Sequence, residues 1–208
     1  MEHLEELSVS ESSGMSFKLS INNCPKLRMR NGPLLPRAAR WLEIIQSDNV
    51  LSSWGECKMS STGASSSSSS SSFSIGVLTT TTSLKVGYSE LPMQQWRLLR
   101  HLFGLHFLEI TSCPNLTVSP DIIPHLSSVT RLVISACDIS SLPHWLMDLT
   151  SLEHLGIAYC TDIRSLPDGI QQLTKLQTLY INGCPDLKKW CESEENKMKL
   201  AHIEEKVL

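Results

Sequence analysis

The chain has 208 residues, of which 41% are hydrophobic but only 6% aromatic, and its formal net charge is −3. This apolar content is enough to bury a core, which leucine and isoleucine must fill because aromatic residues are scarce. The slight excess of acidic residues argues against nucleic acid as a partner, since phosphate binding needs a basic surface. No run of 18 apolar residues occurs, so no membrane span is predicted.

The N-terminal segment, residues 1–6, is acidic and lacks the apolar stretch of a secretory signal. We therefore expect a cytoplasmic location. The seven cysteines are then expected to be free thiols in a reducing compartment.

A short pattern recurs three times before residue 90, with apolar residues alternating with polar ones ahead of a small residue. The copies are Leu19-x-Ile21-x-x-Cys24, Leu42-x-Ile44-x-x-Ser47 and Leu84-x-Val86-x-x-Ser89. Such alternation is typical of a half-buried strand. Leu4-x-x-Leu7-x-Val9 looks like a further partial copy, and we assign residues 1–56 to degenerate repeats.

The interval between the second and third copies is longer than one period. Ser47 and Ser89 are 42 residues apart, and the run of eight serines from Ser65 to Ser72 lies between them. Serine runs cannot bury apolar surface and tend to be disordered. We assign residues 57–76 to a disordered insertion within one repeat.

Residues 77–187 contain regular repeats. Their cysteines, spaced 24, 23 and 24 residues apart, are Cys113, Cys137, Cys160 and Cys184. A leucine or valine, a leucine and an isoleucine precede each cysteine at fixed offsets, which matches the L-x-x-L-x-L-x-x-N/C pattern of leucine-rich repeats. The expected fold is an α/β solenoid, with a curved parallel sheet on its concave side and short helices or 3-10 turns on its convex side.

The second half of each repeat contains a Leu-Pro pair, at Leu142-Pro143 and Leu166-Pro167. Proline fixes the backbone and blocks strand pairing, so these pairs should lie on the convex side. Trp145 follows the first pair. Its position favours packing in the core, with recognition of a partner as the alternative.

The repeated cysteine stands where the chain must turn away from the strand, and its side chain can donate to the turning backbone. Metal binding is disfavoured, because zinc sites need cysteines or histidines at short spacing. Cys57 and Cys191 lie outside the pattern and have no assigned role.

The residues of each strand that point away from the core should form columns on the concave face. One column is Phe107, Arg131, His154 and Thr178; the next is Glu109, Val133, Gly156 and Tyr180; the third is Thr111, Ser135, Ala158 and Asn182. Packing does not fix these residues, so they can encode a partner. The candidate partner-binding residues are Phe107, Glu109, Arg131, His154, Thr178, Tyr180 and Asn182.

No phosphate-binding loop, nucleophile elbow or metalloprotease motif occurs in the sequence. Neither His144 nor His154 has an evident catalytic partner. We expect neither an enzyme nor a cofactor or metal site. Residues 188–208 are charged and are expected to cap the open end of the core.

The segment from Leu142-Pro143 through Leu155-x-Ile157-x-x-Cys160 resembles the repeats of plant nucleotide-binding leucine-rich-repeat disease-resistance proteins of the coiled-coil type. The ending Cys184-Pro185-Asp186-Leu187 is similar to theirs. The resemblance covers residues 90–208 well and residues 1–50 loosely. It implies a domain that senses pathogen effectors or a guarded host protein and restrains a nucleotide-binding switch in defence.

The family's phosphate-binding loop is not in this sequence, so the resemblance implies no nucleotide site here. It would make the chain a C-terminal fragment, a truncated product or a partial gene model. The alternative is the substrate-recognition arm of a ubiquitin ligase, which needs an F-box-like segment before the repeats. The identity of the ligand and the oligomeric state stay open.

Overall fold

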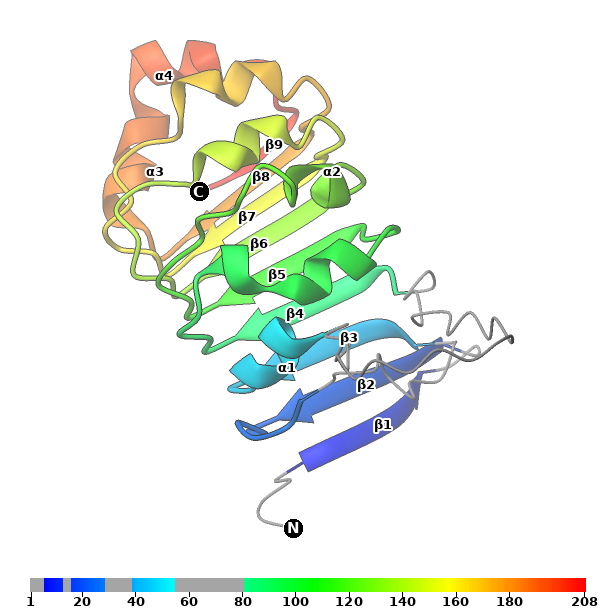
Figure 1. Cartoon of the computed structure of the whole chain (residues 1–208). Helices are drawn as coiled ribbons and strands as arrows, with labels where there is room; N and C mark the ends of the chain where they lie inside the picture. The colour runs from blue at the N-terminus through cyan, green and yellow to red at the C-terminus, as the bar shows by residue number, and fades with distance from the viewer. Residues whose placement is uncertain (1–5, 13–15, 29–38, 55–80) are drawn as a thin grey trace, which may run out of the picture.

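The computed structural model describes residues 6–12, 16–28, 39–54 and 81–208. One curved sheet follows the chain from β1 to β9, and short helices and turns cover one of its faces (Figure 1). The strands are β1 Glu6–Ser12, β2 Ser16–Asn22, β3 Ala39–Ile45, β4 Ser83–Gly87, β5 Phe107–Thr111, β6 Arg131–Ser135, β7 His154–Ala158, β8 Thr178–Asn182 and β9 Glu205–Val207.

Strands β2 to β9 are parallel and pair in sequence order, as stacked repeats require. The expected α/β leucine-rich-repeat solenoid is therefore confirmed. Strands β3 and β4 pair directly, with Leu42 opposite Leu84, although the segment between them is long. The insertion that we assigned to residues 57–76 lies outside the described residues.

The first strand differs from the repeat that the Leu4-x-x-Leu7-x-Val9 pattern predicted. Strand β1 runs antiparallel to β2, with Leu7 opposite Ile21. The reason is the short connection, since only three residues, 13–15, separate the two strands. A parallel neighbour needs a crossover of a dozen or more residues, whereas a short link can join only antiparallel strands.

The core lies between the sheet and the convex segments. Leu108 and Ile110 of β5 are fully buried, and the equivalent residues of β2 to β8 are 3% exposed or less. Burying a leucine or isoleucine side chain contributes about 1.5–3 kcal/mol. These residues, repeated on seven strands, form the sheet side of the core, and the buried Trp54, Trp96 and Trp145 help to fill its other side.

The convex side is built from single turns and short helices. These are α1 Asp48–Ser53, η1 Met93–Gln95, η2 Arg97–His101, α2 Ile123–Leu126, η3 His144–Asp148 and η4 Asp168–Gln172. Pro143 and Pro167 stand directly before η3 and η4 with extended backbone, as proline at a helix start allows. Trp145 is 5% exposed, and its indole N–H donates to the carbonyl oxygen of Leu116 at 2.6 Å. It therefore packs in the core.

The C-terminal segment closes the last repeat. Helices α3 Pro185–Glu192 and α4 Glu194–Lys199 lead into β9, where Lys206 lies opposite Leu179. The Lys206 ammonium donates to the carbonyl oxygens of Leu200, at 3.2 Å, and Ile203. A charged lysine on an edge strand disfavours the addition of another strand. We infer that residues 188–208 cap the solenoid.

Candidate interaction surface

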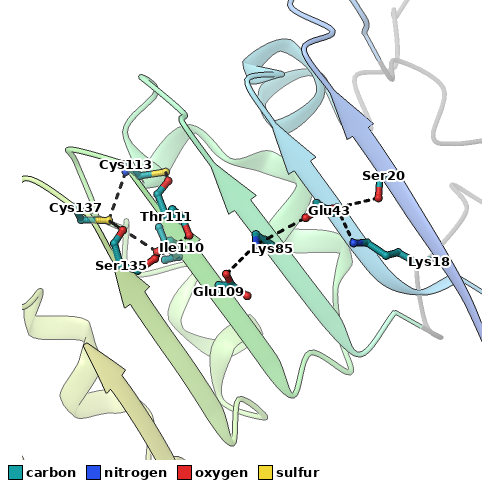
Figure 2. Close-up of polar contacts among 10 residues, drawn as sticks. All are labelled: Lys18, Ser20, Glu43, Lys85, Glu109, Ile110, Thr111, Cys113, Ser135 and Cys137. Carbon is teal, nitrogen blue, oxygen red and sulfur yellow. Dashed lines mark hydrogen bonds and ion pairs between the residues drawn. The ribbon is translucent and has the colours of Figure 1, made fainter. Parts of the chain in front are cut away.

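Strands β2, β3 and β5 to β8 each end in a turn where a cysteine or serine side chain donates to a backbone carbonyl oxygen of the same strand. At the equivalent position after β4, the buried Ser89 hydroxyl has no hydrogen-bond partner among the described residues. The Cys137 thiol donates to the carbonyl oxygen of Ser135 at 3.4 Å, which confirms the expected bond to the turning backbone. Its sulfur also accepts the amide N–H of Cys113, one repeat earlier, at 3.4 Å (Figure 2). Cys160 and Cys184 repeat this contact at 3.3 Å, so the sulfur atoms link neighbouring repeats.

These thiols are structural groups. Burial raises the pKa of Cys113 to about 12 and the pKa values of Cys160 and Cys191 to about 11. A nucleophilic or metal-binding cysteine needs the opposite shift. Within the described ranges, no group of three or more histidine, cysteine, aspartate or glutamate residues could hold a metal ion. Cys57 lies outside those ranges.

The concave face has the three columns that the repeat register predicted. Phe107, Arg131, His154 and Thr178 lie opposite one another along β5 to β8, and the other two columns follow in register. The columns extend to earlier strands, where Trp41, Glu43 and Lys85 precede them. The seven candidate residues therefore lie on one face, but they fall into two groups with different surroundings.

The first group lies toward the N-terminus, where internal ion pairs already occupy the charged side chains. The Lys85 ammonium lies 3.0 Å from a carboxylate oxygen of Glu109 and 3.9 Å from one of Glu43 (Figure 2). Lys18 lies 2.8 Å from Glu43, and the Ser20 hydroxyl donates to the same carboxylate at 2.9 Å. Glu109 is thus the end of a row of alternating charges across four strands.

The row of charges shifts the titration of its central carboxylate. Burial raises the pKa of Glu43, but the hydrogen bonds from Lys18 and Ser20 and the charges of Lys18 and Lys85 outweigh it. The pKa of Glu43 therefore lies below its usual value of 4.5. A partner that bound here would have to compete with contacts that the free protein already makes.

Phe107 belongs to the same group. Its ring centroid lies 5.3 Å from that of Trp41, two strands away, with 43° between the ring planes. The small Ser83 stands between them on β4 and leaves room for this contact. Phe107 is half-buried, so a large part of its ring is already used for packing.

The second group lies on β6 to β8 and is open. Arg131 is exposed and forms no ion pair with the described residues, and Tyr180 is 42% exposed. Gly156 lies between Val133 and Tyr180 in the sheet and has no side chain on this face. We call Arg131, His154, Tyr159, Tyr180 and Asn182 the tyrosine surface. The remaining candidate, Thr178, is half-buried and donates to Glu205 at 3.4 Å.

The sequence analysis missed Tyr159, which is 62% exposed and follows β7 directly. Its φ of 55° is in the left-handed region, as is that of the residue at this position in each repeat. This turn aims the N–H of Tyr159 at the carbonyl oxygen of Asn182, and the Asn182 side-chain amide donates to the Tyr159 hydroxyl at 3.3 Å. The sequence did contain a signal for this residue, because Tyr159 directly precedes the repeated cysteine Cys160.

Comparison with known proteins supports the repeat assignment. Residues 115–184 match the family model described as R13L1/DRL21 LRRs. Among curated proteins, none matches the chain. With the parallel sheet, this match identifies a leucine-rich-repeat domain, a class of repeat protein that typically serves for protein interaction. No helix in the described part of the chain is long and apolar enough to cross a membrane.

Proposed function

We propose that the chain is the interaction and sensing domain of a plant intracellular immune receptor, working in the cytoplasm in defence. The similarity to R13L1/DRL21-type repeats supports this proposal, together with the Leu-Pro and Cys-Pro-x-Leu elements of the sequence. The partner would be a pathogen effector, a guarded host protein or the receptor's own nucleotide-binding domain. The domain's contribution is binding, through which it would restrain or release the switch.

The observation that carries the proposal is the tyrosine surface. Tyr159 and Tyr180 expose large side chains at the same end of the concave face, where Gly156 adds no side chain of its own. Tyrosine and arginine are enriched at interface hot spots because they bury much area and still offer hydrogen bonds.

Electrostatics favours this end of the face over the other. Binding at Glu109 would disturb its ion pair with Lys85, whereas Arg131 has no such pair within the described residues. An unpaired arginine can form charge-assisted hydrogen bonds with a partner without first losing one. We therefore place the main contact on β6 to β8, with Phe107 and Glu109 at its border.

The genomic reading frame upstream of this sequence tests the receptor assignment. A phosphate-binding loop of the form G-x-x-x-x-G-K-[ST], continuous with the repeats, would support an immune receptor. An F-box-like helical segment would instead identify the arm of a ubiquitin ligase. Transcript sequencing across the junction would show whether the segments are expressed together.

A further inference from the structure

A groove of about 620 Å³ lies beside the turns that follow β5 and β6, and none of its lining residues belongs to the tyrosine surface. Its lining residues come from the segment that leads from β5 to α2 and from the segment that leads from β6 to η3. Pro114, Val118 and Ile123 line one wall, and Ile139 and Pro143 line the other. Its volume lies in the range of about 300–1,000 Å³ that is usual for ligand sites.

The groove exists because two successive repeats fill the flank unequally. Val118 and Leu142 both stand five residues after the repeated cysteine, but valine is the smaller and is only half-buried. Asp121 is eight residues after Cys113, and the residue at the same offset from Cys137 in the next repeat is the buried Trp145. Asp121 instead binds Arg100 at the surface, at 2.7 Å. The earlier repeat therefore leaves space beside the later one.

Hydrogen bonds to both neighbouring repeats hold the walls in place. The carbonyl oxygens of Asn115 and Thr117 accept the amide N–H groups of Met93, at 3.1 Å, and Gln94, at 2.8 Å. On the other side, the carbonyl oxygen of Leu116 accepts the Trp145 indole N–H. A preformed groove costs little ordering entropy when a ligand binds.

The charged side chains that line the groove include acidic residues but no lysine or arginine. The exposed residues Asp138 and Asp148 are part of its lining, and neither carboxylate forms an ion pair or hydrogen bond with the part of the chain that the structure describes. The lining includes His144 but no lysine or arginine. Two unpaired carboxylates beside proline, valine and isoleucine side chains complement a cation that has apolar neighbours.

We propose that this groove binds an extended peptide segment of a partner protein in which an arginine or lysine stands between apolar residues. The apolar side chains would pack on Val118, Ile139 and Pro143. The cation would lie against Asp138 and Asp148, since charge-assisted hydrogen bonds to carboxylates are the stronger kind. This is a second binding surface, and it does not depend on the tyrosine surface.

The test uses two synthetic pentapeptides, one with arginine at its centre between leucine and proline residues and one with glutamate in place of the arginine. Amide shifts of the labelled 208-residue chain are followed by NMR. We expect saturable shifts at Val118, Ile139 and the Trp145 indole with the arginine peptide only. Saturation by both peptides, or by neither, would overturn the proposal.

Variants that replace aspartate by asparagine test whether the peptide binds in this groove. Asp138→Asn combined with Asp148→Asn should weaken binding of the arginine peptide at least tenfold. Asp162→Asn combined with Asp168→Asn, which changes two exposed carboxylates of the next repeat outside the groove, is the matched control and should bind as the parent does. Equal loss in both double variants would mean that net charge alone attracts the peptide. Tyr180→Ala should leave the peptide affinity unchanged, which separates this groove from the concave face.

Discussion

The amide N–H of Cys113 donates to the sulfur of Cys137 at 3.4 Å, and the two residues hold the same position in successive repeats. An equivalent hydrogen bond joins Cys24 to Ser47, but its acceptor is a hydroxyl oxygen in place of sulfur. The amide N–H of Cys24 donates to the Ser47 hydroxyl oxygen at 2.9 Å. At Ser47 and Cys137 a small side chain thus both donates to its own strand and accepts from the previous repeat. Cysteine is common here because it does this while remaining apolar enough for burial.

Cys137→Ala should destabilise the protein by about 1–3 kcal/mol, because it leaves the buried N–H of Cys113 without an acceptor. Cys137→Ser should cost less than half as much, since Ser47 makes the equivalent contact. Urea unfolding of both variants measures the difference. If alanine were tolerated better than serine, the sulfur would be a packing group and its hydrogen bonds would contribute little.

Leu155→Ala tests the register of the core. Leu155 is 1% exposed on β7, and truncating a buried leucine costs about 2–5 kcal/mol through lost burial and a cavity. Thr174→Ala, at an exposed position after η4, is the control and should change the free energy of unfolding by less than about 0.5 kcal/mol. A loss below about 1 kcal/mol at Leu155 would show that this side chain does not point inward.

Glu43 should make stability depend on pH in the acid range. Its pKa is lowered on folding, so the unfolded state binds the proton more readily. The stabilisation is complete above the unfolded pKa of 4.5 and is lost as pH falls through the lower folded value. Glu43→Gln should therefore reduce the slope of unfolding free energy against pH between about pH 5 and 3. Glu204→Gln, an exposed control, should keep the parent slope.

The two groups on the concave face should respond differently to truncation. Phe107→Ala should lower the free energy of unfolding by about 0.5–1.5 kcal/mol through the lost ring contact alone, because the ring packs against Trp41. Tyr180→Ala and Arg131→Ala should change it by less than about 0.5 kcal/mol, because both side chains are exposed. Denaturant melts of the three variants compare these values. Equal effects at Phe107 and Tyr180 would contradict the division of the face.

Much of the fold could be predicted from the sequence because one spacing determines it. The 23- and 24-residue period places Leu108, Leu132 and Leu155 in register on adjacent strands, and the structure pairs them so. The direction of β1 was not predictable from its apolar pattern alone. Alternation identifies a strand, but the length of the connection decides whether it runs parallel or antiparallel.

The candidate site was predictable only in outline. The columns followed from the repeat, but the pairing of Glu109 with Lys85 and of Phe107 with Trp41 joins residues from different repeats. Such contacts depend on side-chain length and on small neighbours such as Ser83, which the repeat pattern does not specify. Tyr159 was missed because the outward columns were counted only within the strands.

Site-directed photo-crosslinking tests the binding role of the tyrosine surface most directly. A photoreactive amino acid would replace Tyr180 or Arg131 on the concave face, or Gln171, an exposed residue of η4 on the convex side. After illumination in plant tissue, mass spectrometry would identify any attached protein. We expect the same partner from positions 180 and 131 and none from position 171. Crosslinks from position 171 alone, or none from either concave position, would contradict the assignment.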